Sequence, residues 1–194
     1  GLSGWWCKPY MYSADLPLNG TVLYMDLDVV ISNNIDKLFN WNLNKWCTIR
    51  DFTRVMRPTW EKYNSSVVRF KTGELDFVWK DFINNSTKIQ AKYHGDQDWL
   101  YANVKSQYNF WPDEWIQSYK WEMRGRPEMN RYNWIKSWKW EIRKSKQISR
   151  GERGFRKLTT VENVQPSSEC SICVFHGDPN PEHCEDPWVI DNWK

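Results

Sequence analysis

Short apolar runs alternate with turn signals through the first half of the chain. Residues 21–25 follow the turn pair Asn-Gly, and a second apolar run covers residues 29–31. Runs of this length, rich in β-branched residues and bounded by turn residues, predict strands of a buried sheet. The same reasoning predicts strands at residues 47–50 and 66–70.

Helical patterns lie between and after these strands. Residues 35–39 follow two asparagines, which are common where a helix begins. Residues 75–82 have apolar side chains spaced as on one helix face, and residues 96–104 begin with acidic side chains that the helix dipole stabilises. This order of strands and helices predicts an α/β domain.

Two carboxylates stand where the first apolar run ends. Asp26 and Asp28 are separated only by Leu27. Alternate residues of a strand share one face, so a strand ending here would present both carboxylates on the same side. They would repel each other and be costly to bury without a counter-ion. The pair therefore predicts a site for a hard divalent cation, with a solvated turn at the strand end as the alternative.

Length, charge and cysteine usage narrow the setting. A chain of 194 residues fits one domain with a sizeable core, so we predict a single domain over residues 1–194. No apolar run is long enough to span a bilayer. The net charge of +3 is too small to indicate a nucleic-acid partner by itself. Five irregularly spaced cysteines argue against a disulfide framework and predict a reducing, cytoplasmic location.

Cysteines and histidines near the C-terminal end resemble a set of zinc ligands. The set is Cys170, Cys173, His176, His183 and Cys184. Residues 170–175 are nevertheless typical of a strand, where side chains three positions apart face opposite ways. We therefore do not expect a structural zinc site there.

Beyond Phe110 the chain becomes rich in tryptophan and basic residues. Residues 138–143 alternate with period two, which favours a half-buried strand. Aromatic and basic side chains together could bind single-stranded nucleic acid, and aromatic rings also stack on sugars. The alternative, which we favour, is that these rings fill a core short of leucine and isoleucine.

Four sequence blocks, taken together, resemble one protein family. They are Gly-Trp-Trp-Cys-Lys at 4–8 with the Asp-x-Asp run at 23–31, Tyr-Asn-Ser-Ser-Val at 63–67, Gly-Asp-Gln-Asp at 95–98, and Phe-His-Gly-Asp-Pro-Asn-Pro at 175–181. A lone Asp-x-Asp motif is weak, but four blocks in this order are specific. The chain resembles the metal-dependent GT-A-type glycosyltransferases, in the group that contains glycogenin and bacterial lipopolysaccharide galactosyltransferases, and particularly its small bacterial and phage relatives.

The resemblance implies a metal-assisted transfer of a sugar. Asp26, Asp28 and His176 would coordinate Mn²⁺ or Mg²⁺, which bridges the donor's diphosphate and stabilises the departing nucleotide. The donor would be a nucleotide-sugar, with a UDP-sugar as the first expectation, and the acceptor a carbohydrate or other hydroxyl compound. The family retains the anomeric configuration, so the implied activity is that of a retaining hexosyltransferase.

The resemblance also implies roles for the other matched residues. Asp96 and Gln97 would be the catalytic positions, on the side where sugar and acceptor meet. The implied donor-binding residues are Lys8, Asn64, Lys120, Gly177 and Asn180.

Two departures from the family pattern stand out. Asn180 replaces the lysine that the family usually has in its His-Gly-x-Pro-Lys-Pro loop, which removes a positive charge from the diphosphate side. Lys8 or Lys120 would have to compensate. The family's first strands and helix, which hold the nucleotide base and ribose, have no counterpart before Gly1 in this sequence.

The expected fold is thus α/β, GT-A-like and partially Rossmann-type, in a single domain with a mixed sheet and a Trp-rich C-terminal part. Three functions remain open. The first is a glycosyltransferase, the second a catalytically silent module that binds a carbohydrate or nucleotide, and the third, least favoured, a nucleic-acid-binding protein.

Overall fold

The structure is a computed structural model that describes residues 2, 4–55, 57–104, 108–123, 164–176 and 179–193. The strand predicted at residues 138–143 and the expected donor contact Gly177 lie outside the described residues.

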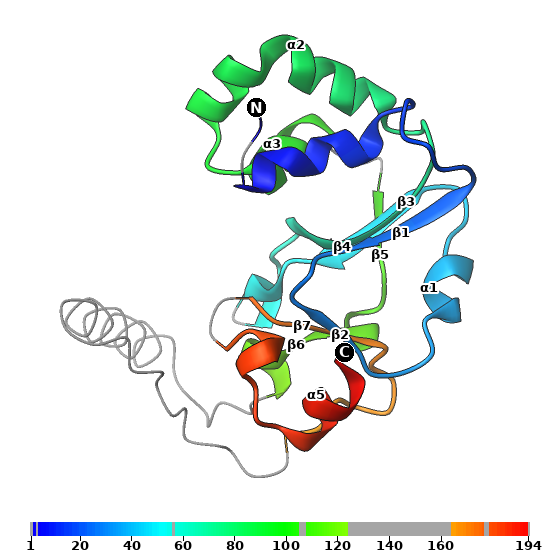
Figure 1. The fold of residues 1–194 in the computed structure, drawn as a ribbon, viewed down its shortest axis with the longest axis vertical. Helices are drawn as coiled ribbons and strands as arrows, with labels where there is room; N and C mark the ends of the chain where they lie inside the picture. The colour runs from blue at the N-terminus through cyan, green and yellow to red at the C-terminus, as the bar shows by residue number, and fades with distance from the viewer. Residues whose placement is uncertain are drawn as a thin grey trace, which may run out of the picture.

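Four strands of the described chain form a mixed central sheet (Figure 1). Their order is β1 (Thr21–Met25), β4 (Tyr63–Lys71), β3 (Trp46–Arg50) and β5 (Tyr108–Phe110). β4 runs antiparallel to both of its neighbours, whereas β5 runs parallel to β3. The strands expected at 21–25, 47–50 and 66–70 are therefore confirmed, and β4 begins three residues earlier than predicted.

A smaller sheet joins segments from three distant parts of the sequence. Its strand order is β2 (Val29–Ile31), β7 (Ile172–Val174) and β6 (Ile116–Ser118). β2 is antiparallel to β7, and β6 is parallel to it. The two apolar runs that flank the aspartate pair thus belong to different sheets.

This arrangement corrects the prediction for the aspartate pair. Asp26 and Asp28 lie in the turn between β1 and β2 rather than on a strand. The residues of β1 are also only partly buried, because β1 has one neighbouring strand among the described residues. A turn at this point allows the chain to pass from one sheet to the other without placing two carboxylates in a sheet interior.

A layer of helices lies on one side of the central sheet, and the small sheet lies on the other side (Figure 1). This layer contains the 3₁₀ helix η1 (Gly4–Tyr12), α2 (Asp76–Lys92) and α3 (Asp96–Asn103). The other helical elements are α1 (Asp36–Asn40), η2 (Phe52–Val55), η3 (Asp113–Trp115), the π-helical turn η4 (Tyr119–Met123), η5 (Pro181–His183) and α5 (Pro187–Asn192). The three predicted helices are confirmed, and α2 extends ten residues beyond its apolar pattern.

The alternation of side chains along β4 explains the two sides of the sheet. Val68 and Phe70 point into an apolar cluster with the aromatic side chains of the helical layer, including Trp6 and Phe82. Val67 belongs to a second cluster with residues of the small sheet. Because alternate strand residues face opposite ways, one strand supplies both cores.

Arg69 is buried on β4 and anchors the segment that follows α1. Its guanidinium donates to the carbonyl oxygens of Leu38 and Phe39 at 3.0 Å each, Asn42 at 2.9 Å and Lys45 at 3.0 Å. Carbonyl groups at the end of a helix lack partners within the helix, so a buried guanidinium satisfies them and is satisfied in return.

No helix in the described ranges is both long enough and apolar enough to cross a membrane. All five cysteines are free, and four of them are buried.

Candidate functional site

Asp26 lies where the chain leaves the central sheet, and protein groups hold both of its carboxylate oxygens. The Lys8 ammonium donates to Oδ2 at 2.7 Å, and the Tyr24 hydroxyl donates to Oδ1 at 2.8 Å. The side chains of Lys8 and Asp26 are only 19% and 17% exposed. The carboxylate thus already has a largely desolvated counter-ion from η1, which reaches it because η1 packs against α2 and α3.

Asp28 forms no ion pair with any described residue, and its charged form is less favourable. Burial, with the nearby charge of Asp26, raises the pKa of Asp28 above its ordinary value. Its carbonyl oxygen accepts a hydrogen bond from the Phe175 amide at 2.8 Å, which holds the turn against the end of β7. Leu27, between the two aspartates, is 95% exposed. A cation beside Asp28 would relieve the cost of keeping this carboxylate ionised.

A relay of polar side chains connects Lys8 to the start of α3. Lys8 Nζ lies 3.5 Å from Ser65 Oγ, which donates to Asp96 Oδ2 at 3.2 Å. The Ser65 amide donates to Gln97 Oε1 at 3.2 Å, and Gln97 Nε2 lies 3.5 Å from Asp51 Oδ2. The structure therefore brings Lys8, Asp96 and Gln97 together.

Asp96 is only 4% exposed, and burial raises the pKa of its carboxyl group, while the Lys8 charge opposes that rise. Burial therefore favours the protonated form and Lys8 the ionised form. Removal of Lys8 would raise the cost of an ionised carboxylate at the start of α3.

Asn64 shapes the site through the backbone. Its Oδ1 accepts from the Ser66 amide at 2.8 Å, and its carbonyl accepts from the Thr48 hydroxyl at 2.8 Å. The pairing of β3 with β4 shifts register between Thr48 and Ile49. Asn64 thus stabilises this shift in strand register, at which Ser65 and Ser66 turn toward the site. The Asn64 side-chain oxygen already accepts a hydrogen bond within the protein.

His176 follows β7 and lies in an aromatic pocket. Its Nε2 is 2.5 Å from Ser118 Oγ, and its ring stacks on Phe52 with centroids 5.2 Å apart. Burial lowers the pKa of His176 to about 4, and the nearby Lys120 charge adds to this effect. The imidazole is therefore neutral at ordinary pH, the form in which histidine binds metals.

The lowered pKa of His176 should make the protein less stable in mild acid. The unfolded chain takes up a proton near pH 6.5, whereas the folded chain resists it down to about 4, so stability is full above 6.5 and is lost as the pH falls between these values. We expect a loss of about 1 to 2 kcal/mol between about pH 7 and 5, measured by urea unfolding without metal. His176→Gln should flatten this dependence, whereas the exposed His183→Gln should not. Equal slopes for wild type and His176→Gln would contradict the assignment.

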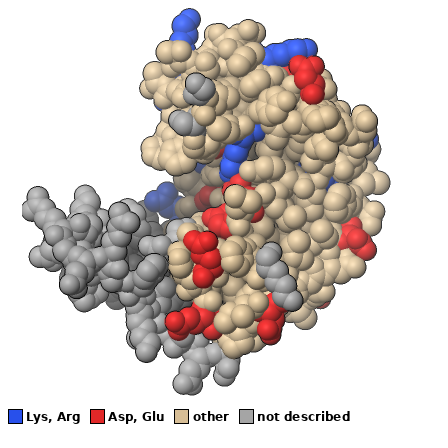
Figure 2. Space-filling model, in the orientation of Figure 1, with Lys and Arg blue, Asp and Glu red and all other residues tan. Residues whose placement is uncertain are grey.

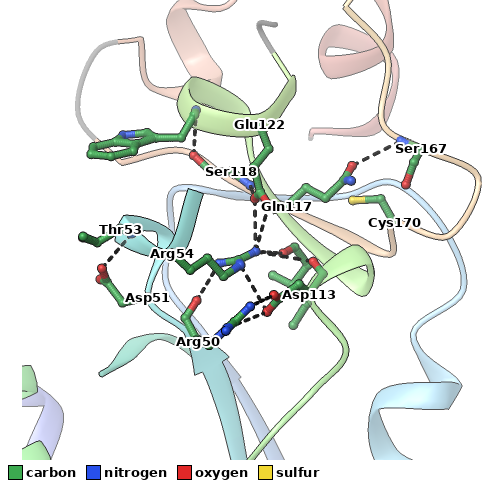
Figure 3. A network of polar contacts seen from close by, with 12 residues as sticks. Arg50, Asp51, Thr53, Arg54, Asp113, Gln117, Ser118, Glu122, Ser167 and Cys170 are labelled. Carbon is green, nitrogen blue, oxygen red and sulfur yellow. Dashed lines mark hydrogen bonds and ion pairs between the residues drawn. The ribbon is translucent and has the colours of Figure 1, made fainter. Parts of the chain in front are cut away.

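An ionic network around the buried Arg54 holds Ser118 (Figure 3). Ser118 in turn contacts His176. Arg54, whose side chain is 3% exposed, contacts Glu122 Oε1 at 3.0 Å and Asp113 Oδ1 at 3.1 Å. Glu122 Oε2 in turn accepts from the Ser118 amide at 2.7 Å. Arg50 adds a second ion pair to Asp113. The network fixes β6 and η4 beside η2.

The three expected metal ligands have the right chemistry for a divalent metal, but their arrangement in the structure does not yet form a metal site. Two carboxylates and an imidazole suit Mn²⁺, and the carboxylates also suit Mg²⁺. Within the described ranges, however, no three His, Cys, Asp or Glu side chains gather as a metal site would require. Asp26 is paired with Lys8 and Tyr24, and His176 with Ser118. Metal binding would therefore require these partners to rearrange.

The structure says less about the other residues expected to bind the nucleotide-sugar donor. Lys120 lies on η4, close enough to His176 for its charge to affect that ring. Asn180 precedes η5, and its carbonyl accepts from the His183 amide at 3.0 Å. Gly177 is outside the described residues.

A hollow of about 300 Å³ opens beside the relay. Residues of η1, of β4 and of the segment that begins α3 line it, among them Lys8, Ser65, Asp96 and Gln97. Basic and acidic side chains come close together near the middle of the face in Figure 2. The hollow can accommodate a small polar ligand such as a sugar ring.

Sequence reasoning missed Tyr24, Ser65 and Ser118. Tyr24 could have been found, because it stands two residues before Asp26 and alternate strand positions share a face. No local signal marks Ser118, because its partner His176 lies 58 residues away.

Comparisons with known proteins bear on the fold. No protein-family model matches the chain, and no curated protein matches it either. The solved structures that resemble it include the glycosyltransferase GlyE of Streptococcus pneumoniae TIGR4, with a TM-score of 0.52 and 15% identity over 90% of this chain and 38% of that chain.

Two further structures show the same likeness. The galactosyltransferase LgtC, in complex with donor and acceptor sugar analogues, has a TM-score of 0.51 and 14% identity over 92% of this chain and 60% of that chain. The bifunctional glycosyltransferase WbbM has a TM-score of 0.55 and 14% identity over 98% of this chain and 37% of that chain. The chain spans less than two thirds of the length of each. Its fold is that of the GT-A-type glycosyltransferases.

Proposed function

We propose that this chain is the catalytic part of a metal-dependent hexosyltransferase that moves a sugar from a nucleotide-sugar, first of all a UDP-sugar, to a hydroxyl acceptor with retention. The observation that supports this most is the convergence of Asp26, Lys8, Asp96 and Gln97 beside one hollow. The fold likeness to glycosyltransferases adds to it.

Asp26 and Asp28 would hold Mn²⁺ or Mg²⁺, with His176 as a third ligand once it leaves Ser118. When bound, the metal would supply Lewis-acid assistance to the departing diphosphate. Lys8 would then be free to contact a phosphate oxygen, because its ammonium is a flexible point charge rather than a fixed fork.

Asp96 and Gln97 would orient the reacting sugars, on the side where the donor sugar and the acceptor meet. Ser65 holds both residues, so their carboxylate and amide groups are placed before the ligand arrives. Asp96 is partly neutralised by Lys8 across Ser65, and movement of Lys8 toward a phosphate would leave its carboxylate free to accept a hydroxyl proton or hydrogen bond.

A catalytically silent sugar- or nucleotide-binding module is the second candidate. The ion pair between Lys8 and Asp26 favours it, because a carboxylate that already has its counter-ion binds a metal less readily. The nucleic-acid hypothesis rested on the Trp-rich basic segment, most of which lies outside the described residues.

A screen of nucleotide-sugars for Mn²⁺-dependent hydrolysis and transfer tests the proposal. We expect release of nucleoside diphosphate from at least one donor, its loss in a chelator, and its loss in Asp26→Asn. Sugar or nucleotide binding without turnover would favour the silent module instead. Steep salt dependence of oligonucleotide affinity would favour the nucleic-acid hypothesis.

Lys8→Met should separate metal binding from diphosphate binding. We expect the variant to bind Mn²⁺ alone several-fold more tightly than wild type, because the competing ammonium is gone, and to bind a nucleoside diphosphate with Mn²⁺ more weakly. Electron paramagnetic resonance of free Mn²⁺ and calorimetry measure the two effects. Lys62→Met, which breaks an exposed 3.5 Å pair with Asp98, is the matched control. Unchanged Mn²⁺ affinity in Lys8→Met would show that Lys8 does not compete with the metal.

A further inference from the structure

The Trp5 ring is half-exposed, and its position is fixed by contacts with His94 and Gly95. It is 52% exposed, whereas the adjacent Trp6 is buried. Its ring stacks on that of His94, with centroids 5.9 Å apart and planes inclined by 19°. Its indole also lies against Gly95, where an added Cβ would stand 3.3 Å from Nε1. Glycine at position 95 thus allows a close approach that a larger residue would disturb.

The ring forms one wall of the hollow of about 300 Å³, and the other walls are polar. Apart from His94 and Gly95, the remaining lining residues carry hydroxyl, amide, ammonium or carboxylate groups, namely Lys8, Ser65, Ser66, Asp96, Gln97 and Asp98. One aromatic wall facing hydrogen-bonding groups suits a pyranose, which presents C–H groups on a face and hydroxyl groups around its edge.

The charges of the hollow favour a neutral ligand. Asp96 and Asp98 place two carboxylates in its lining, and Lys8 provides the single cation among those residues. Lys8 is paired with Asp26, and Lys62 pairs with Asp98 from outside the lining, so both ammonium groups already have a carboxylate partner and would compete with a phosphate group. A hydroxyl-rich neutral ring can donate hydrogen bonds to both carboxylates.

The position of the hollow relative to the aspartate pair indicates which sugar it takes. Lys8 and Ser66 line the hollow and also contact Asp26, but Asp26 and Asp28 are not among the lining residues. If the diphosphate is held at the aspartates, then a ring bound in the hollow lies beside the diphosphate site and not within it.

We propose that Trp5, seated on His94 and Gly95, is the stacking platform for a neutral pyranose of the acceptor. The identification of that sugar as the acceptor rests on the proposed function, whereas binding of a pyranose at Trp5 does not. Trp5 is a specificity-determining contact, and the carboxylates opposite it select hydroxylated rings.

Sugar binding without donor or metal tests this directly. Neutral mono- and disaccharides of glucose and galactose are titrated into the protein and followed by saturation-transfer NMR and calorimetry, with uridine in a parallel arm. We expect at least one sugar to bind wild type, at least tenfold weaker binding in Trp5→Ala, and a smaller loss in Trp5→Phe. Gly95→Ala should also weaken binding, because its Cβ displaces the ring.

Trp193→Ala is the matched control, because Trp193 is a 36% exposed tryptophan at the end of α5 and is not among the lining residues. Its sugar affinity should equal that of wild type, and thermal melts confirm that each variant is folded. Three results would overturn the proposal. They are a sugar affinity of Trp5→Ala equal to that of wild type, no binding of any sugar by wild type, and an affinity that depends on Trp5 for uridine alone. If sugars bind at Trp5 but the donor screen shows no transfer, the stacking role of Trp5 is supported and the proposed transferase activity is refuted.

Discussion

Asp28→Asn is expected to lower the Mn²⁺-dependent affinity for a nucleoside diphosphate by about 100-fold, or about 2.7 kcal/mol. Among the described residues, Lys8 pairs with Asp26 and no lysine pairs with Asp28, so Asp28 has the most to gain from a cation. Calorimetry with Mn²⁺ and UDP measures the loss. Asp36→Asn, at an exposed carboxylate on α1, is the control and should bind as wild type does.

The same substitution should stabilise the metal-free protein. A carboxyl group with a raised pKa contributes most to stability below its unfolded value, and this contribution is lost as the pH rises through its folded pKa. Asparagine mimics the protonated form, so Asp28→Asn should melt higher than wild type at about pH 7 and equally at about pH 3. Unchanged UDP affinity together with an unchanged melting temperature would refute the metal assignment of Asp28.

Arg54→Met is expected to destabilise the fold by about 3 kcal/mol, because it leaves the largely desolvated Glu122, whose side chain is 20% exposed, without its partner. Burial already raises the pKa of Glu122, and Arg54 is the main group that counteracts this. Urea unfolding at neutral pH measures the change. Arg57→Met is the control, because Arg57 is exposed beside Trp60 and should cost less than about 0.5 kcal/mol.

A second substitution separates lost charge pairing from lost packing. The double variant Arg54→Met with Glu122→Leu should be less destabilised than Arg54→Met alone, since it removes the stranded carboxylate as well. The Ser118 amide would still lose its acceptor, so the double variant should remain below wild type. A loss under about 1 kcal/mol in Arg54→Met would show that water reaches this network.

Local patterns were sufficient for most regular elements. Residues 21–25 and 66–70 carry dense β-branched and aromatic side chains, and both are strands. The spacing of Leu75, Val78 and Phe82 gives one apolar helix face, and all three are buried in the core beneath α2. These predictions succeeded because strand and helix periodicity are properties of neighbouring residues.

Other elements had no local signal. Residues 4–12 contain four aromatic side chains and a proline without helical spacing, yet they form a 3₁₀ helix packed on α2. The three-residue strands β5 and β6 were not predicted either. Such short strands exist only because partners such as β3 and β7 supply their hydrogen bonds.

The sequence by itself determined which polar groups are available to the candidate site: the carboxylates of Asp26 and Asp28, the ammonium of Lys8, and the Asp96–Gln97 pair at a helix start. Motif and order suffice for this, because the residue types and their spacing are local. Only the tertiary structure decided that the aspartates lie in a turn between two sheets and that Lys8 forms an ion pair with Asp26. It also decided that His176 is held by Ser118, because each of these contacts joins segments that meet only when the sheets and helices pack.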